Sequence, residues 1–537
     1  MMKKAIKKLL AALLAVAMLC AMAIPAFAYN YWETEEDLGT NHCYDAFQIF
    51  TGDVTGNDTD GFKISNVGWG SSIAHPNEFL AQLTKDSTIG GEFETSFTPQ
   101  EAAAVISQWS DSDNNSIAFA RCVCNYVYSD GNSTPVLQGG HTNGFKLEEA
   151  GYYLIVDTSS FSSDANNDSY HAYNSFLLKV NQANYHVQIT PKVVKPTVEK
   201  KVYDNDDNSS WGDNNGWGSS ADHAINEEFK FRLIAKLPAS EGRAYDYYKK
   251  YTVCFNDTLS EGITFDKLDT VEITNGDGGA SQVIDAANYT RTPNGSQFFK
   301  LSIDDVKTCA PGLDLNDGAT ITVTYTAHLN ENAAVNGSAE NKNSVRLQYS
   351  NNPRPDGEYL GYTPNYTPES EVYVYTYQLN NTKLAENEHG APLKDVGFRL
   401  YSDADYKNEV ELYQDGKFYY PIKNASNKQA VEMKSAEDGT FNVKGLDAGT
   451  YYLKETKTPA DYNPCDVPPV IIKANHKGNQ VDLNGSTLST TIINKKAGGI
   501  TLPSTGGIGT TIFYVVGGGL MVAAIVLLVT KKRMENK

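Results

Sequence analysis

The stretch ATITVTYTAHL, residues 319–329, decides the fold class of this chain. Its residues Ile321, Val323 and Tyr325 alternate with threonines, and a period of two is typical of a β-strand with one buried face. The same alternation recurs in VRLQYS from Val345, VGFRLYS from Val396 and TYYLKET from Thr450. Turn residues separate these stretches at intervals typical of β-sandwiches, so we predict an all-β fold.

One stretch favours a helix instead. In TPQEAAAVISQW, residues 98–109, Thr98 can cap the helix and Glu101 occupies the third helical position. This arrangement is the capping box, in which each side chain bonds the backbone N–H of the other residue. We therefore predict one helix after Thr98 within an otherwise all-β chain.

Clustered prolines separate the predicted domains. Pro191 and Pro196 flank KVVK, and a second proline group lies in residues 353–368. Because proline lacks the N–H that a strand interior needs, both stretches suit linkers. We predict tandem immunoglobulin-like β-sandwich domains in an elongated array, at residues 29–193, 194–365 and 366–498.

The first 28 residues predict secretion. Lysines near the N-terminus precede an apolar run from Leu9 to Ile24, and the segment ends in Ala26-Phe27-Ala28. This order is the pattern of a secretory signal peptide with its small-residue cleavage site. Residues 1–28 are therefore expected to be absent from the mature protein.

A second apolar run, from about Thr511 to Val529, predicts a membrane-spanning segment within residues 499–537. At about 1.5 Å per residue, the run is long enough to cross about 30 Å of hydrocarbon. Basic residues follow at once, and such residues favour the cytoplasmic side of a membrane. We therefore expect the C-terminal segment to cross the membrane.

Leu502-Pro503-Ser504-Thr505-Gly506 stands just before that segment. The order of pentapeptide, apolar span and basic tail resembles the LPXTG sorting signal of sortase substrates. The resemblance implies that a sortase cysteine cuts between Thr505 and Gly506 and passes the Thr505 acyl group to an amine. It also implies attachment to peptidoglycan on a Gram-positive cell wall, with pilus-class and housekeeping sortases as partners.

Composition narrows the function classes. The formal net charge of −20 repels phosphate backbones, so nucleic acid is not an expected partner. The nine histidines are scattered, and neither H-E-x-x-H nor G-x-S-x-G occurs, so we expect no cofactor and no catalysis on an external substrate. Asp- and Asn-rich tracts at residues 53–60 and 204–215 are interpreted as solvated loops without metal, because no complete calcium loop occurs there.

The cysteines do not form an obvious disulfide framework. Cys254 and Cys309 are the candidate pair, because exported chains favour disulfides. Cys465 is alone in its region, which argues against a complete set of bridges. Another kind of cross-link is therefore expected.

The last predicted domain directs three polar side chains into its core. Lys383 shares a strand face with the apolar residues of YTYQLNNTK, since side chains repeat every second residue. Glu455 does the same in YYLKET, and Asn494 does so in TIINKK. Buried alone, each polar group would cost several kcal/mol, so we expect the three to meet.

A buried lysine, acid and asparagine in contact can react with one another. Desolvation favours the neutral forms, which makes the amine a nucleophile and lets the protonated carboxyl polarise the amide. Holding the groups together supplies a large effective molarity. The expected products are one Lys–Asn isopeptide bond and ammonia, formed once within the chain.

The same region resembles the Cna-B type domains of Gram-positive pilins, whose E-box reads Y-x-L-x-E-T-x-x-P-x-G-Y. The matching residues are Tyr451, Leu453, Glu455, Thr456, Pro459 and Tyr462, with Asp461 in place of the glycine. The resemblance covers residues 375–496. It implies that Lys383 joins Asn494, with Glu455 as the catalytic acid.

The middle domain repeats this logic. Lys200 points inward with the valines of PTVEKKV, and Asn343 shares a face with the apolar residues of ENKNSVRLQYS. These strands resemble those that open and close the second domain of backbone pilins. The resemblance implies that Asp257 in FNDTLSEG is the catalytic acid, and Glu227 and Glu228 on the preceding strand are the alternatives.

The end of the first domain carries the candidate polymerisation amine. HVQITPKVV resembles the pilin motif W-x-x-x-V-x-V-Y-P-K, although Ala183 and Thr190 replace its aromatic residues. The resemblance implies that Lys192 attacks the acylated Thr505 of the next subunit, with Lys195 as the fallback. The opening strand of this domain has no lysine, so no isopeptide bond is expected there.

Together these resemblances imply a backbone pilin, the shaft subunit of a sortase-polymerised pilus that supports adhesion. Identical subunits would join head to tail, from Lys192 to Thr505. The alternative is a wall-anchored or pilus-tip adhesin with the same modules, which could bind a host ligand but would not polymerise. Lys192 discriminates between them, because a shaft subunit needs both an amine and a sorting signal.

Overall fold

A computed structural model describes most of the chain between residues 43 and 498. The described residues are 43–57, 61–109, 113–129, 133–141, 145–158, 175–180, 185–187, 195–206, 210–211, 216–240, 243–276, 278–292, 297–352 and 366–498. The predicted signal peptide and membrane-spanning segment lie outside them. Within the described residues, no helix has the length and apolar character needed to cross a membrane.

The chain divides into two compact units. They comprise residues 1–376 with 474–482, and residues 377–473 with 483–537. We expected the last domain to begin at residue 366, but β19 (Ser370–Tyr375) pairs with β18 (Lys342–Tyr349) of the middle domain. The second unit therefore begins at Tyr377, because the hydrogen-bond ladder of the middle domain continues beyond the proline-rich segment.

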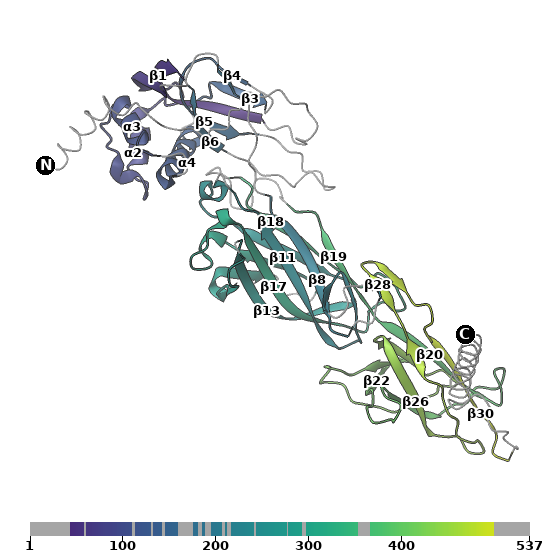
Figure 1. The fold of residues 1–537 in the computed structure, drawn as a ribbon. Helices are drawn as coiled ribbons and strands as arrows, with labels where there is room; N and C mark the ends of the chain where they lie inside the picture. Colours follow the sequence, from purple (N-terminus) through teal and green to yellow (C-terminus); the bar gives the residue numbers. More distant parts are fainter. Residues whose placement is uncertain are drawn as a thin grey trace, which may run out of the picture. The chain divides into compact units, whose positions relative to one another are not determined.

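The predicted first and middle domains both lie in the first unit, and the part predicted as the first domain is a β-sheet with helices packed on it. The strands run in the order β2 (Gly61–Trp69), β1 (Cys43–Asn57), β5 (Gly151–Asp157) and β6 (Ser175–Val180); β3 (Leu137–His141) pairs with β1, and β4 (Phe145–Leu147) pairs with β7 (Tyr185–Val187). The helical elements are α2 (Pro76–Leu83), η1 (Gly90–Glu92), α3 (Pro99–Ile106) and α4 (Asn114–Ser129). Figure 1 shows the α-helices beside β1 and β5, where Phe47, Phe79 and Phe119 share one core.

A capping box at the start of α3 confirms the predicted helix. The Glu101 backbone N–H donates to Thr98 Oγ1 at 3.3 Å, and the Thr98 N–H donates to the Glu101 carboxylate at 2.9 Å. The sequence did not indicate α4, whose many β-branched and aromatic residues have modest helix propensity. Tertiary packing decides its structure, because Phe119 and Val123 are fully buried in the core of the domain.

The middle domain contains two six-stranded sheets. One sheet has the order β10 (Ser220–Asp222), β19, β18, β12 (Val253–Leu259), β16 (Phe298–Ile303) and β15 (Tyr289–Thr292). The other has the order β14 (Gln282–Val283), β13 (Ile263–Asn275), β17 (Ala319–Leu329), β11 (Glu228–Leu237), β8 (Thr197–Asp204) and β9 (Gly216–Gly218). Short 3-10 turns lie at η2 (Ala244–Tyr247), η3 (Ala286–Asn288), η4 (Val306–Thr308) and η5 (Leu315–Asp317).

Strand β17 has the structure that its alternating sequence predicts. It pairs with β11 on one side and β13 on the other, so it lies inside its sheet (Figure 1). Ile321, Val323 and Tyr325 are fully buried on one face. The predicted all-β fold is therefore confirmed, with helices confined to the first domain apart from short turns in the described residues.

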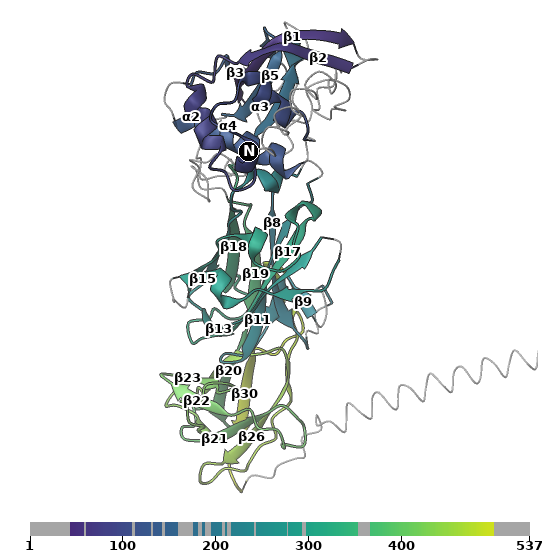
Figure 2. The same ribbon diagram turned by 90° about the vertical axis from the view of Figure 1, so that its left-hand side faces the viewer.

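The second unit has two sheets of its own. Their orders are β22 (Leu412–Asp415), β23 (Phe418–Pro421), β25 (Asn442–Leu446), β20 (Tyr377–Ala385) and β30 (Ser489–Asn494), and β24 (Met433–Lys434), β21 (Gly397–Tyr401), β26 (Gly449–Lys457) and β27 (Val470–Ile472). Figure 2 shows β20 beside β30, and the two pair in parallel with Lys383 opposite Ile492. The first and last strands of this unit are therefore neighbours.

A hairpin from the late chain belongs to the first unit. It consists of β28 (Asn475–Lys477) and β29 (Gln480–Asp482). His476 is fully buried, with Nδ1 2.8 Å from Ser220 Oγ, and the Tyr375 O–H donates to the Gly478 carbonyl at 2.8 Å. These contacts join the hairpin to the strands of the middle domain.

The candidate Cys254–Cys309 disulfide is not formed. Both thiols are free and buried, and burial raises the pKa of Cys254 to about 11. Cys254 Sγ lies 3.9 Å from Asn256 Nδ2 instead. The general preference of exported chains for disulfides was therefore a wrong guide for this pair. A bridge also requires a specific geometry between the two cysteines.

Removing the cap of α3 should loosen this helix. Thr98→Ala should destabilise the helix by about 1 kcal/mol and raise amide hydrogen exchange within α3 about fivefold, because the Glu101 N–H loses its acceptor. Thr98→Ser is the matched control, since it keeps the hydroxyl. Unchanged exchange in the Thr98→Ala protein would contradict this assignment.

Candidate functional site

The middle domain holds a buried polar site between its two sheets. Lys200 comes from β8 in one sheet, while Asp257 of β12 and Asn343 of β18 come from the other. Lys200 is 2% exposed, and Asp257 and Asn343 are 0% exposed. Side chains alternate along each strand, so the strand register itself directs these three groups inward.

The Lys200 amine and the Asp257 carboxyl are in direct contact. Lys200 Nζ lies 2.5 Å from Asp257 Oδ2, and both side chains are closed to solvent. Lys200 also lies over the rings of Phe231 and Tyr325, at 5.4 Å from each ring centroid. The reactive groups predicted from the sequence therefore lie in an apolar environment.

The Tyr325 hydroxyl connects the three predicted groups. It receives a hydrogen bond from Lys200 Nζ at 3.1 Å and one from Asn343 Nδ2 at 2.6 Å, and it donates to Asp257 Oδ2 at 3.2 Å. The sequence placed Tyr325 on the buried face of its strand but did not indicate this role. Its polar hydroxyl among buried aliphatic residues was the available signal, since a buried tyrosine O–H needs a partner.

Burial shifts the protonation of this site. Desolvation lowers the pKa of Lys200 to about 8, and the neighbouring Asp257 opposes that shift. Desolvation also raises the pKa of Asp257, against the opposing effect of Lys200. Both shifts favour a neutral amine beside a neutral acid, which is the state in which the amine is a nucleophile.

Aromatic rings surround the Tyr325 side chain. The rings of Phe231, Phe265 and Phe299 lie 5.3 Å, 5.4 Å and 5.4 Å from the Tyr325 ring, centroid to centroid. Phe231 and Phe299 are fully buried. This packing keeps the polar groups in a low-dielectric environment, where their mutual interactions are stronger than in water.

The alternative acids of the middle domain lie elsewhere. Glu228 is exposed, and its carboxylate is 3.7 Å from Lys267 Nζ. Glu227 is partly buried, and its carboxylate accepts from the Ala224 N–H at 3.4 Å. Asp257 is the acid that touches Lys200.

The second unit brings its predicted residues to one end of the β20–β30 pair. Lys383 and Asn494 are both 0% exposed. Asn494 Nδ2 donates to Glu455 Oε1 at 2.8 Å, and Lys383 Nζ donates to the Ile492 carbonyl at 3.1 Å. Desolvation lowers the pKa of Lys383, while Cys465 and Glu455 oppose the shift.

Cys465 is a further member of the site in the second unit. Its Sγ donates to Glu455 Oε2 at 3.1 Å, so the two carboxylate oxygens contact different side chains. Desolvation and, to a smaller extent, this hydrogen bond raise the pKa of the thiol to about 12. The sequence showed Cys465 only as an isolated cysteine three residues beyond the E-box, and its partner became visible in the fold.

The residues predicted for attachment and polymerisation lie outside the described part of the chain. These are Lys192 and the pentapeptide Leu502 to Gly506. The fallback amine Lys195 is described, and partial burial lowers its pKa.

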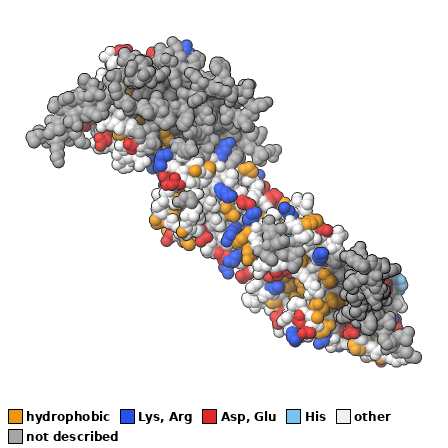
Figure 3. All heavy atoms as spheres, in the orientation of Figure 1, with side chains coloured by type: hydrophobic (Ala, Val, Ile, Leu, Met, Phe, Trp, Pro, Cys, Tyr) orange, Lys and Arg blue, Asp and Glu red, His pale blue; other side chains and the backbone are white. Residues whose placement is uncertain are grey.

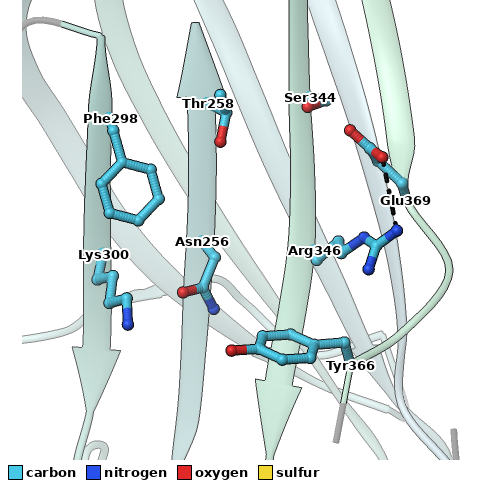
Figure 4. Close-up of a pocket in the computed structure, with 8 residues that line it drawn as sticks. All are labelled: Asn256, Thr258, Phe298, Lys300, Ser344, Arg346, Tyr366 and Glu369. Atoms are coloured by element: carbon cyan, nitrogen blue, oxygen red, sulfur yellow. Dashed lines mark ion pairs between the residues drawn. The ribbon is translucent and has the colours of Figure 1, made fainter. Parts of the chain in front are cut away.

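A surface hollow of about 330 Å³ lies on the outer face of the middle domain (Figure 4). Lys300, Asn256 and Arg346 stand side by side on β16, β12 and β18, and an ion pair of 3.7 Å joins Arg346 to Glu369. Asn256 alternates with Asp257 along β12, so the hollow is on the opposite face of the sheet from the buried site. Among the coloured residues of Figure 3, basic and acidic side chains are interspersed over this domain.

Three residues of the first unit have the types and spacing of metal ligands. Asp204, Asp222 and His476 are buried, and one potential ligand atom of each lies within 4.8 Å of the others. Asp204 begins a tract that we interpreted as a solvated loop. It is 2% exposed instead, because its carboxylate accepts the backbone N–H groups of Asp206 and Asp222.

Two segments match known protein families. Residues 378–487 match SpaA, a prealbumin-like fold domain, and residues 494–536 match the LPXTG cell wall anchor motif. This is a cell wall-anchored surface protein. The anchor match confirms the predicted sorting signal of this wall-anchored protein, and the prealbumin-like match contains Lys383 and Glu455.

The comparison of this wall-anchored protein with solved structures found several major pilins, each with a TM-score below 0.5. The T6 backbone pilin of Streptococcus pyogenes is 15% identical, with a TM-score of 0.48 over 86% of this chain and 97% of that one. SpaD from Corynebacterium diphtheriae is 18% identical, with a TM-score of 0.40 over 85% and 93%. A C-terminal fragment of the pilin GBS80 of Streptococcus agalactiae is 22% identical, with a TM-score of 0.39 over 56% and 99%. No curated protein sequence matches the chain.

The Cys465 thiol should titrate far above an ordinary cysteine. In the folded protein its alkylation by iodoacetamide should still rise steeply between pH 9 and 10.5, because the reactive thiolate forms only near a pKa of about 12. Glu455→Gln should shift the profile to lower pH, since it removes the carboxylate that opposes thiolate formation. The urea-unfolded chain is the control. If Cys465 has the same pH profile of alkylation in the folded and unfolded protein, the contact between Cys465 and Glu455 is contradicted.

Proposed function

We propose that this wall-anchored protein is the backbone subunit of a sortase-assembled pilus, and that self-formed Lys–Asn isopeptide bonds lock its middle domain and its second unit. The observation that carries the proposal is the Lys200 amine, which is buried in contact with Asp257 while Tyr325 bonds both Lys200 and Asn343. Leaving such groups unreacted and unpaired in a core would be costly. Amide formation removes both the basic amine and the primary amide.

The proposed chemistry is an intramolecular condensation. The neutral Lys200 amine attacks the Asn343 carboxamide carbon, and ammonia leaves, with Asp257 as the acid that exchanges protons. In the second unit Lys383 attacks Asn494, with Glu455 in the same role. Each bond forms once, so the protein is not an enzyme with an external substrate.

Such bonds suit a fibre under tension. A Lys200–Asn343 bond would join β8 and β18 of facing sheets, and a Lys383–Asn494 bond would join the neighbouring strands β20 and β30. Force that enters on one strand would leave through the covalent bond without shearing the hydrogen-bond ladder. The loop closed in each domain exceeds 100 residues, so each bond should also stabilise by about 4–5 kcal/mol, as a long-loop disulfide does.

Polymerisation would use Thr505 near the C-terminal end of the mature chain and Lys192 at the end of the first predicted domain. The sorting signal supplies the Thr505 acyl group, and Lys192 supplies the amine of the next subunit. Wall anchoring would then transfer the final subunit to peptidoglycan. The resulting fibre would support adhesion of the cell.

Intact mass measures the internal chemistry directly. The mature ectodomain should be about 34 Da lighter than its sequence mass, because two isopeptide bonds release two molecules of ammonia. The Asn343→Ala and Asn494→Ala proteins should each retain one bond, so each should show about half of this mass loss relative to its own sequence mass. Lys201→Ala is the matched control, because Lys201 is the outward neighbour of Lys200 and should leave the mass loss intact. A mass equal to the sequence mass would refute the proposed bonds.

Cell-wall extracts test the fibre. In a host with the pilus sortase, the wild-type protein should form a ladder of detergent-resistant polymers, and Lys192→Ala should leave monomers because the accepting amine is lost. Lys195→Ala should retain the ladder. A wild-type extract that contains only monomers would contradict the proposed shaft subunit and favour the wall-anchored adhesin.

A further inference from the structure

The leaving group poses a chemical problem in the middle domain. Amide nitrogen departs readily only after it has gained a proton, so some group must deliver one to Asn343 Nδ2. Asp257 Oδ2 contacts Lys200 Nζ at 2.5 Å, which suits removal of a proton from the attacking amine. Among the described residues, Asp257 Oδ1 has no hydrogen-bond partner, and neither has Asn343 Oδ1. The acid therefore does not bond the amide directly.

The Tyr325 hydroxyl lies on the path between the acid and the amide. Its oxygen is 3.2 Å from Asp257 Oδ2 and 2.6 Å from Asn343 Nδ2, both within hydrogen-bond range. These contacts form a chain from Lys200 through Asp257 and Tyr325 to Asn343. All four hydrogen-bonded side chains are at least 98% buried, so bulk water has no access to them.

We propose that Tyr325 is a catalytic residue that relays a proton from Asp257 to the departing nitrogen of Asn343. This inference rests on the isopeptide chemistry of the proposed function and names a group that this chemistry requires in the middle domain. Tyr325 therefore contributes more than packing to this site.

The proposed reaction passes through a tetrahedral intermediate at Asn343 Cγ. The lone pair of neutral Lys200 Nζ forms a bond to Asn343 Cγ, and the carbonyl electron pair moves to Oδ1. Tyr325 gives its hydroxyl proton to Nδ2 and takes the carboxyl proton of Asp257, and Asp257 then accepts a proton from the cationic Nζ. The Cγ–Nδ2 bond breaks as the carbonyl re-forms, ammonia leaves, and Tyr325 and Asp257 end in their starting states.

The environment of Tyr325 suits this role. Burial, together with the nearby Asp257 charge, raises the pKa of the phenol well above its ordinary value, so the hydroxyl holds its proton at ambient pH. Phe231, Phe265 and Phe299 pack around the ring and hold it in place. A positioned, protonated hydroxyl is what a relay needs before the amine attacks.

The second unit provides an internal comparison. There Glu455 Oε1 accepts directly from Asn494 Nδ2 at 2.8 Å, so the acid can deliver the proton without an intermediary. The contrast predicts that loss of a tyrosine hydroxyl matters in one site of this chain and not in the other. Both bonds can be followed in the same molecule.

The test measures the two bonds separately over time. The full mature chain is made in a short cell-free translation pulse, and the cross-linked tryptic peptides of Lys200–Asn343 and Lys383–Asn494 are quantified by mass spectrometry. Tyr325→Phe should slow the first bond at least about tenfold, because general acid–base groups contribute roughly 10²–10⁴-fold, and should leave the second bond unchanged. Tyr245→Phe is the matched control, since Tyr245 is buried in the same domain and its hydroxyl donates to the Pro238 carbonyl instead.

A fluorinated tyrosine separates relay from orientation. Site-specific 3-fluorotyrosine at position 325 keeps the hydroxyl and its contacts but makes the phenol more acidic. A relay predicts a severalfold change in the rate of the first bond and a shifted pH–rate profile, whereas a merely orienting hydroxyl would leave both unchanged. This variant also remains informative if Tyr325→Phe does not fold.

The outcomes separate this inference from the proposed function. If the wild type forms the Lys200–Asn343 bond and both Tyr325 variants form it at the wild-type rate, the relay is overturned and the isopeptide chemistry stands. If the wild type never forms that bond, the proposed function fails in the middle domain. A slowed Tyr325→Phe protein with a normal second bond and an altered fluorotyrosine profile supports the relay.

Discussion

A lysine amine held away from water beside a carboxyl group is the interaction on which the rest of this structure depends. Lys200 and Asp257 meet between two six-stranded sheets, where neither can be hydrated. An ion pair in such a place is a poor source of stability, because desolvation offsets much of the attraction. The same desolvation lowers the pKa of the amine and raises that of the acid, which prepares them to react.

The two buried sites reach a similar arrangement by different geometry. In the middle domain the lysine and the asparagine lie on strands of opposite sheets, whereas in the second unit they lie on the parallel neighbours β20 and β30. Each acid also has a partner outside the predicted set. Tyr325 contacts Asp257, and the Cys465 thiol donates to Glu455. Both partners are protonated donors, because burial keeps their pKa values high.

The wall anchor and the internal sites serve one mechanical purpose in the proposed function. A protein fixed to peptidoglycan at its C-terminal end experiences tension along its chain whenever its far end is held. Hydrogen-bond ladders yield one bond after another under shear, whereas a covalent link between strands does not. The Cys254 and Cys309 thiols are free, so this pair does not cross-link the middle domain. Another kind of covalent cross-link would therefore add mechanical strength there.

The sequence by itself determined which side chains face inward, since a period of two assigns Lys200, Asn343, Lys383 and Asn494 to buried faces once the strands are recognised. It also indicated the sorting signal, because the order of pentapeptide, apolar run and basic tail is local, and the anchor match confirms it. Tertiary structure decided what those side chains meet. Tyr325 is 125 residues from Lys200, and strand pairing over that distance leaves no trace in a local pattern. The same reason explains why β19 joined the middle domain and why the buried α4 overrode its modest helix propensity.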